Sequence, residues 1–381
     1  MELDNFIYNP TQKTILDNGS FTWKAPSNIA LVKYWGKREP QLPENPSISF
    51  TLDACHTETT LEFKKREKSA EISKLESDAT FAQSLTQKEF KIDIFLDGEN
   101  KPEFRKKIVV FLMRIGKLVP FISDYDFVIR THNSFPHSSG IASSASGMSA
   151  LALCIMSMEK ALNPDISDEM FYKKASFLAR LGSGSAARSI EGPLVVWGKH
   201  NAIKNSSDLF GVKFTGDLHD KFKNYHDTIL LVDKGEKQVS STVGHNLMNN
   251  HPFAQQRFEQ ANENIIKISE ALKTGNLKTF ISIVESEALT LHSMMMTSHP
   301  YFILMKPNTL EIINRIWAFR EETNTNICFT LDAGANVHVL FPDEEKETCN
   351  LFIMNELIQF CQNNHYICDK VGFGANQIKP Q

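Results

Sequence analysis

The serine- and glycine-rich stretch Phe135–Gly147 is the first candidate for chemistry in this sequence. It reads FPHSSGIASSASG and is followed at once by the apolar run Met148–Met158. A loop of small and hydroxyl residues that opens a helix presents backbone N–H groups, serine hydroxyls and the positive end of the helix dipole to one point. This arrangement suits a phosphate group. A turn that only caps a core helix has the same composition and is the alternative.

Cationic side chains gather in a second stretch. Lys33, Tyr34, Lys37 and Arg38 lie within one segment of six residues. The flexible backbone at Gly36 would let these cations and the phenol converge on an anion. A solvated basic turn is the alternative interpretation.

A second small-residue loop, Gly182–Ser189, reads GSGSAARS and contains Arg188. The planar guanidinium clamps a carboxylate or phosphate with two hydrogen bonds. A turn with a structural arginine is the alternative, but two anion loops in one chain favour binding. The stretch Val239–His245, VSSTVGH, adds a further hydroxyl-bearing turn.

Asp332 is the candidate acid–base group. It follows the apolar stretch 327–331 and stands next to Ala333 and Gly334. A carboxylate at the end of a buried strand orients or deprotonates a hydroxyl if it faces the anion loops. A turn-forming aspartate is the alternative.

The elements between these stretches predict an α+β chain. Short apolar or alternating runs predict strands at 29–32, 48–52, 59–63, 90–96, 125–131, 194–197, 228–232, 327–331 and 337–341, with a hairpin turn at Asp97-Gly98. Helical spacing predicts helices behind the serine loop and at 103–118, 168–181, 253–272, 277–291, 309–322 and 344–362. Less structure is expected at 1–20, a surface arm, at 64–88, a charged surface excursion, and after 371.

Size and composition describe an ordinary globular protein of two domains. The chain has 381 residues, 41% of them hydrophobic and 23% charged, and a formal net charge of −4, which argues against a general nucleic-acid surface. Its six cysteines form no CxxC pair, so neither a zinc site nor a disulfide framework is indicated. The start MELDNFIYNP resembles no signal peptide, and no run of about 18 apolar residues occurs. We therefore expect a cytoplasmic protein that does not bind membranes.

Six motifs occur in the order known from one family. They are NIALVKYWGKR at 28–38, LPENPSISFTL at 42–52, the FPHSSGIASSASG loop, GSGSAARSI at 182–190, SSTVGH at 240–245 and LDAGAN at 331–336. In these motifs the chain resembles the GHMP kinase superfamily and, within it, the diphosphomevalonate decarboxylases. Related kinases share the serine-rich ATP loop, whereas KYWGK and GSGSAxRS are distinctive of the decarboxylase branch.

The resemblance implies a GHMP kinase fold with its active site in a cleft. A ribosomal protein S5 domain 2-like N-terminal domain would span 1–225, and a ferredoxin-like C-terminal GHMP domain would span 226–381. The implied reaction is the decarboxylation of mevalonate 5-diphosphate to isopentenyl diphosphate, ADP, phosphate and CO2, with ATP and Mg²⁺, in the mevalonate pathway of isoprenoid biosynthesis. Phosphorylation of the tertiary hydroxyl replaces a poor leaving group by a good one. Many family members are homodimers.

The resemblance also implies roles for individual residues. Asp332 would orient or deprotonate the C3 hydroxyl and Arg188 would hold the substrate carboxylate, with Lys37 and Ser144 completing the catalytic set. Substrate contacts are implied for Asn28, Tyr34, Trp35, Gly36, Lys37, Ser183, Gly184, Ser185, Ala186, Ala187, Arg188, Ser241 and His245. Nucleotide contacts are implied for Ser139, Gly140, Ser143, Ser144 and Ser146, with Ser144 reaching the phosphoryl group or magnesium. Lys33 would support the same pocket.

Two residues depart from the family pattern. His245 stands where methionine is usual, and Ala335 replaces the proline of DAGPN. Neither change removes an expected charge. His245 is either a structural imidazole or an influence on how the 5-phosphates sit, which leaves a monophosphate substrate open.

Three alternative functions stay open at this point. Two belong to the same superfamily, a mevalonate 5-phosphate decarboxylase and a mevalonate-type small-molecule kinase. The third is a non-catalytic GHMP-fold regulator that binds a ligand. The presence of Asp332, Arg188, Lys37 and Ser144 weighs against the regulator.

Overall fold

The first half of the chain is built on a mainly antiparallel sheet. The computed structural model describes residues 3–10, 14–67, 90–136, 141–233 and 241–379. Within these ranges the strand order is β14-β1-β4-β7-β5-β6, and β8 joins β9 to β4. The strands are β1 Asn18–Val32, β4 Ser47–Lys65, β5 Ile92–Leu96, β6 Glu99–Asn100, β7 Tyr125–Asn133, β8 Leu194–Trp197, β9 Val212–Lys213 and β14 Asn376–Ile378.

Strands β1 and β4 form a long antiparallel pair, from Asn18 opposite Lys64 to Val32 opposite Ile48. The predicted strands 48–52 and 59–63 are therefore parts of one strand. The sequence between them gives no strand signal. In the structure its backbone N–H groups bind the side chain of Asp369 on β13 (Tyr366–Lys370). The carboxylate of Asp369 accepts the N–H groups of residues 53, 54 and 55 at 2.7–2.9 Å, which fills a break in the register of the pair.

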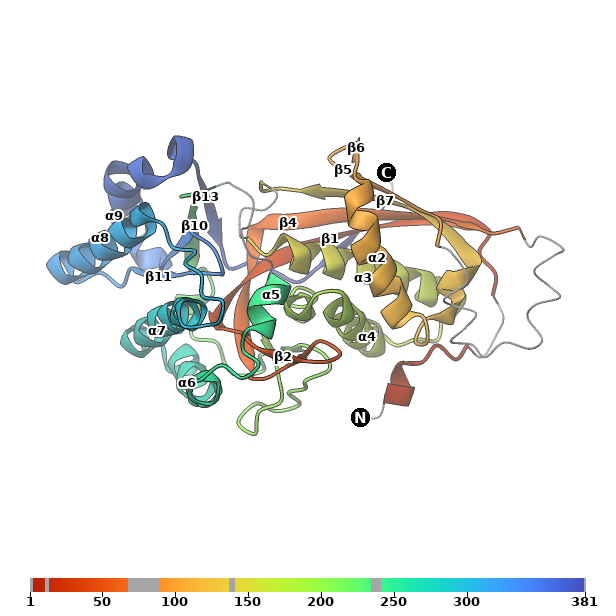
Figure 1. Cartoon of the computed structure of the whole chain (residues 1–381), viewed down its shortest axis with the longest axis horizontal. Coiled ribbons are helices and arrows are strands. Elements are labelled where there is room, and N and C mark those ends of the chain that lie inside the picture. Colours follow the sequence, from red (N-terminus) through yellow and green to blue (C-terminus); the bar gives the residue numbers. More distant parts are fainter. Residues whose placement is uncertain (1–2, 11–13, 68–89, 137–140, 234–240, 380–381) are drawn as a thin grey trace.

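Helices cover one face of this sheet (Figure 1). They are α2 Arg105–Ile115, α3 Ser143–Leu162 and α4 Asp168–Gly182. Helix α3 is buried along most of its length because it lies between the sheet and α4. The hydroxyl of Ser167 accepts the N–H of Met170 at 3.2 Å, which caps the first turn of α4. This packing fixes the start of α3, where the serine loop ends.

The second half contains a smaller antiparallel sheet with helices around it (Figure 1). Its strands run β11-β12-β10-β13, which are Cys328–Thr330, Val337–Phe341, His226–Leu230 and Tyr366–Lys370. The helices are α5 Ser241–Asn246, α6 Ala254–Thr274, α7 Leu277–Met296, α8 Pro307–Thr323 and α9 Lys346–Phe352. Helix α5 lies at the junction of the two halves, above the short pair β2 Lys37–Arg38 and β3 Leu42–Pro43.

Of three sequence predictions about the chain ends, two are wrong and the helix 344–362 is confirmed only in part. The arm 1–20 is not only a surface segment, because Phe6 is fully buried against Phe177 at a centroid distance of 4.5 Å. The predicted helix 344–362 is α9 followed by π and 3-10 turns. The tail after 371 forms β14, which pairs with residues 22–24 of β1 and brings the C-terminus to the first half (Figure 1).

The other predicted strands and helices of the described residues are confirmed, with shifts of a few residues at most ends, except that β1 begins at Asn18, well before the predicted strand 29–32. Most of the charged excursion 64–88 lies outside the described residues. All six cysteines are free thiols, five of them buried and Cys368 exposed. No helix in the described ranges has the length and apolar character needed to span a membrane. The domain division at 225 stays a prediction.

Candidate active site

Lys33 and Asp332 meet where the two halves of the chain join. Lys33 follows the last residue of β1, and Asp332 follows β11 by two residues. The Lys33 Nζ lies 3.1 Å from the Asp332 Oδ1, and the two side chains are 2% and 27% exposed. Burial lowers the pKa of Lys33, and the charge of Asp332 opposes part of this shift. The carboxylate is thus the partly open member of a pair whose ammonium is buried.

Arg188 is buried, and among the described residues its side chain donates hydrogen bonds to uncharged acceptors only. Its Nε donates to Ser49 Oγ at 2.6 Å, its Nη1 to Ser47 Oγ at 2.5 Å and its Nη2 to Asn28 Oδ1 at 3.4 Å. Burial lowers the pKa of Arg188 to about 10, while the charge of Asp332 acts in the opposite direction. A guanidinium in this setting remains charged, and an anion brought beside it offsets the cost of burial.

The YWGK segment is held by His245. The backbone N–H of Gly36 donates to His245 Nδ1 at 3.1 Å, and the imidazole lies 4.2 Å from the Tyr34 ring and 4.7 Å from the Trp35 ring, centroid to centroid. Burial lowers the pKa of His245 to about 3, so the ring is neutral at physiological pH. A Cβ on Gly244 would lie 2.5 Å from Trp35, so only glycine allows this approach. The geometry supports the structural interpretation of His245.

Lys37 is the last residue of the YWGK segment and the first of β2. Its Nζ donates to Gln41 Oε1 at 2.9 Å, and burial lowers the pKa of its ammonium group. Gln41 is uncharged, so the contact orients the ammonium without neutralising it. The hydrogen-bond partner of Lys37 therefore carries no charge that would compete with an anionic ligand.

The two small-residue loops meet at their serines. The Ser144 Oγ lies 3.3 Å from the Ser183 Oγ, and Ser144 is exposed. Helix α3 begins at Ser143, and the preceding Ala142 offers no side-chain cap. The first N–H groups of a helix have no partner within the helix, so this end favours a phosphate.

Ser146 has a different position from the other serines of this loop. It is fully buried, and its hydroxyl lies 2.6 Å from Thr57 Oγ1 of β4. We therefore correct its assignment from nucleotide contact to support of α3. Ser139 and Gly140 lie outside the described residues, and Ser241 begins α5 but its side chain also lies outside them.

Gly184 and the two alanines of the loop before Arg188 are packed against their surroundings. Ala186 and Ala187 are buried, and their carbonyls accept the hydroxyls of Ser149 and Ser176, each at 2.9 Å. A Cβ on Gly184 would lie 2.9 Å from the Tyr34 hydroxyl. Asn28 Nδ2 donates to Ser189 Oγ at 2.7 Å and to Ser185 O at 3.3 Å. These contacts fix Arg188, and direct substrate contact by the two alanine side chains does not fit their burial.

Magnesium fits this site only through the nucleotide. Among the described residues no group of three His, Cys, Asp or Glu side chains could hold a metal ion. Mg²⁺ commonly binds through substrate phosphates, a few protein oxygens and water. The exposed hydroxyl of Ser144 at the start of α3 is such an oxygen.

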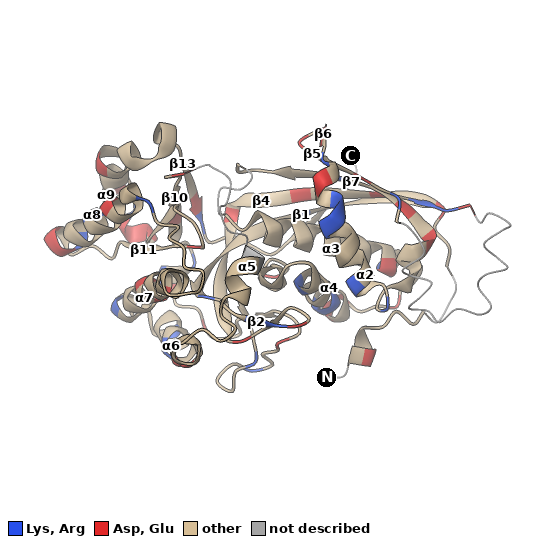
Figure 2. Cartoon of the chain, in the orientation of Figure 1, with Lys and Arg blue, Asp and Glu red and all other residues tan. Residues whose placement is uncertain are grey.

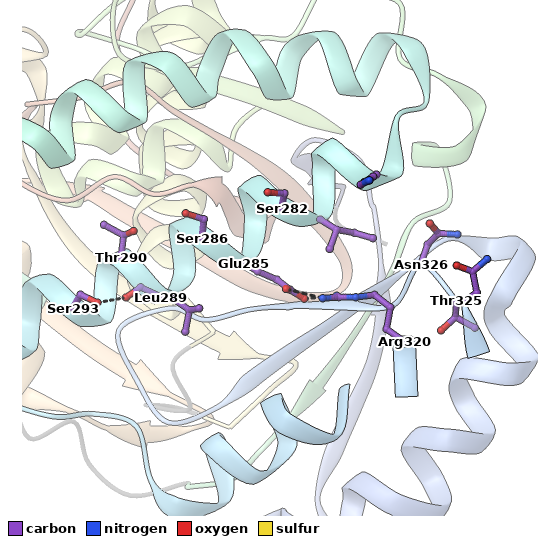
Figure 3. A pocket seen from close by; sticks show the side chains of 12 residues that line it. Ser282, Glu285, Ser286, Leu289, Thr290, Ser293, Arg320, Thr325 and Asn326 are labelled. Atoms are coloured by element: carbon purple, nitrogen blue, oxygen red, sulfur yellow. Dashed lines mark hydrogen bonds and ion pairs between the residues drawn. The ribbon is translucent and has the colours of Figure 1, made fainter. Parts of the chain in front are cut away.

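Among the described residues, charges of both signs lie outside these loops (Figure 2). Lys and Arg are interspersed with Asp and Glu over both halves (Figure 2). A pocket of about 790 Å³ beside α7 and the end of α8 is lined by none of the predicted site residues (Figure 3). Its Arg320 and Glu285 form an ion pair at 2.6 Å and so neutralise each other.

The sequence analysis missed several residues of this site. Ser47 and Ser49 carry a signal, because they alternate with Ile48 and Phe50 on the predicted strand. No sequence signal identifies three further residues, which are Arg257 of α6 and Glu287 and His292 of α7. The sequence of a helix does not show which backbone group a buried polar side chain contacts.

Comparison with known proteins gives two matching family models. The diphosphomevalonate decarboxylase-like N-terminal domain matches residues 25–208. The mevalonate 5-diphosphate decarboxylase C-terminal domain matches residues 228–378.

Individual relatives agree with these models. A diphosphomevalonate decarboxylase of Ganoderma lucidum is 29% identical over 346 residues, which cover 87% of this chain and 81% of the relative. A phosphomevalonate decarboxylase of Haloferax volcanii is 26% identical over 327 residues, covering 85% and 88%. A solved structure of MDDEF in complex with MVAPP, AMPPCP and magnesium has a TM-score of 0.77 and 27% identity, covering 95% of this chain and 99% of that chain. These matches confirm the two-domain α+β GHMP kinase fold, and the chain belongs to the diphosphomevalonate decarboxylase family of the GHMP kinase superfamily.

Proposed function

We propose that this chain catalyses the ATP-dependent decarboxylation of mevalonate 5-diphosphate to isopentenyl diphosphate. The observation that carries the proposal is the Lys33–Asp332 pair close to the buried guanidinium of Arg188. One acid–base group and one carboxylate clamp are the two functions that this substrate requires. The names of the relatives and the ligands of the solved complex support the same reaction.

In the first step Asp332 acts on the tertiary hydroxyl of the substrate. Its carboxylate accepts the hydroxyl proton, and the C3 oxygen attacks the γ-phosphorus of ATP while ADP leaves. The buried Lys33 ammonium balances the negative charge of Asp332 and directs one carboxylate oxygen. The Asp332 side chain is 27% exposed, so the substrate hydroxyl can approach its carboxylate.

In the second step Arg188 holds the substrate carboxylate. The bond between the carboxyl carbon and C2 breaks, its electron pair forms the C2–C3 double bond, and the C3–O bond breaks to release phosphate. Two N–H groups of Arg188 are already directed by Ser47 and Ser49, so the guanidinium is fixed before the substrate binds. Fixed geometry keeps the carboxylate aligned with the leaving group.

The ATP phosphates are assigned to the start of α3. Ser143 and Ser144 with the first N–H groups of the helix would contact them, and Ser144 would also contact magnesium. Bound magnesium neutralises phosphate charge during transfer. Lys37 and the segment Tyr34–Gly36 would hold the 5-diphosphate, with Ser183 and Ser185 on the facing loop.

The test is release of CO2 and ADP by the purified protein with magnesium and ATP. Mevalonate 5-diphosphate, mevalonate 5-phosphate and mevalonate are compared as substrates. Equal amounts of both products from the diphosphate alone support the proposal. Release of ADP without CO2 would identify a kinase. Release of neither product from any of the three substrates would favour a ligand-binding protein.

A mevalonate 5-phosphate decarboxylase is the second candidate. The observation in its favour is the Haloferax volcanii relative, which is a phosphomevalonate decarboxylase and aligns over 85% of this chain. Preference for the monophosphate in the same assay would establish it. His245 then contributes through Gly36 and Tyr34, since its neutral ring does not itself attract a phosphate.

We further propose a cytoplasmic homodimer with domains at 1–225 and 226–381. Free cysteines suit a reducing compartment, and the two family models end and begin on either side of residue 225. Light scattering of the purified protein tests the dimer.

A further inference from the structure

Helix α7 contacts both members of the Lys33–Asp332 pair. Glu287 Oε2 accepts the backbone N–H of Lys33 at 2.9 Å, and His292 Nε2 donates to the backbone carbonyl of Asp332 at 3.1 Å. Glu287 has no exposed surface, and His292 is 1% exposed. Burial lowers the pKa of His292 to about 4, so the ring is neutral and its proton lies on Nε2, which faces the carbonyl. One helix therefore holds the backbone on both sides of the pair.

Arg257 of α6 completes a ring around the Lys33 peptide. Its guanidinium donates to both oxygens of Glu287, at 3.1 Å and 2.5 Å, and to the carbonyl of Lys33 at 3.0 Å. Asn264 Nδ2 donates to Glu287 Oε1 at 2.7 Å. Arg257 and Glu287 are both fully buried, and moving two charges out of water is costly unless every partner is in place. These charges bind the backbone N–H and C=O of Lys33, which belong to the two consecutive peptide units on either side of its Cα at the end of β1.

We propose that Glu287 and His292 are positioning residues, which align the Lys33 ammonium with the Asp332 carboxylate for the reaction. The inference rests on the proposed function, because alignment matters only if Asp332 acts on the substrate hydroxyl. Neither residue is assigned to substrate or ATP. Their loss therefore lowers kcat more than it weakens binding, since a misplacement of about 1 Å costs about 100-fold in rate.

The experiment compares two buried carboxylates. Glu287→Gln keeps the shape of the side chain but removes its charge, and we expect kcat to fall about 10- to 100-fold with KM and the Kd of ATP changed less than about threefold. Glu159→Gln is the matched control. Glu159 is 3% exposed and pairs with Lys174 at 2.7 Å within the first half. The Glu159→Gln variant should lose about as much thermal stability as Glu287→Gln but keep a kcat within about twofold of the wild-type value.

His292 supplies a rescue test on the same helix. His292→Phe removes the donor to Asp332, whereas His292→Gln retains one. We expect a fall in kcat for the phenylalanine variant and at least partial recovery for glutamine. Ser282→Ala, on the exposed pocket face of α7 (Figure 3), should leave kcat unchanged.

Two results would overturn the inference. One is that the Glu287→Gln and His292→Phe variants each have the same kcat as the Glu159→Gln control. The other is loss of substrate or ATP binding in proportion to kcat, which would indicate a disrupted site. Failure of the proposed function is distinct, because the wild-type protein would then release no CO2 from any mevalonate compound.

Discussion

The Nζ of Lys33 lies 3.1 Å from the Oδ1 of Asp332, although 299 positions separate the two residues in the chain. The ammonium is buried, and the carboxylate is 27% exposed. The substrate can therefore approach Asp332 but not Lys33. This asymmetry supports the proposal that Asp332 acts on the substrate hydroxyl, with Lys33 as its counter-ion.

Replacement of Asp332 by alanine should nearly abolish turnover while ATP still binds. The carboxylate acts in the chemical step, so we expect kcat to fall at least about 1000-fold and the Kd of ATP to change less than about threefold. Single-turnover formation of ADP and CO2, together with nucleotide titration, measures both. Turnover that persists while ATP affinity is lost would contradict the role.

Arg188→Lys should impair use of the substrate carboxylate. Lysine keeps the positive charge, but its compact ammonium does not reproduce the planar fork that reaches Ser47 and Ser49 and can bind a carboxylate with two hydrogen bonds. We expect kcat/KM for mevalonate 5-diphosphate to fall at least about 100-fold, with most of the ATP affinity retained. An unchanged kcat/KM in a folded variant would place the carboxylate elsewhere.

Much of the fold and the outline of the site could be predicted from the sequence. Local signals locate the loops at Ser144 and Arg188, because hydroxyls, glycines and cations stand close together in the chain. The contacts that fix them are not local. Ser47 and Ser49 hold Arg188 across the sheet, and their roles depend on how β4 pairs with β8.

The features that the sequence does not predict also depend on contacts between residues far apart in the chain. Strand β14 is the three-residue segment Asn-Gln-Ile, which follows two glycines and gives no strand signal, and it pairs with β1 because the chain returns there. Glu287 reads as an ordinary helix residue, yet it binds a backbone N–H 254 positions away. Single-sequence patterns report which residues form an element, whereas these roles depend on tertiary pairing.

Lys37→Gln should discriminate between the phosphorylated substrates. Lys37 contacts an uncharged partner, so its charge is available to the 5-phosphates. We expect the KM for mevalonate 5-diphosphate to rise at least about tenfold and the KM for mevalonate itself, where it is turned over, to change less than about twofold. Arg38→Gln is the control, because Arg38 is half-exposed and already pairs with Glu44 and Asp208. Equal effects of both variants would contradict a specific contact by Lys37.

Acid should weaken the fold through His245. Its pKa is about 3 in the folded protein, below the ordinary value of 6.5, because the ring is buried. Above pH 6.5 both states are neutral and the group has no effect. As the pH falls below 6.5 the unfolded chain binds a proton that the folded chain does not, so the free energy of unfolding decreases, by about 2 kcal/mol between pH 7 and pH 5. His245→Gln keeps an acceptor for the Gly36 N–H but does not titrate, so urea unfolding at the two pH values should show a pH-dependent loss smaller by this amount than in the wild type. Identical pH dependence in both proteins would show that His245 is protonated in the folded state as readily as in the unfolded chain.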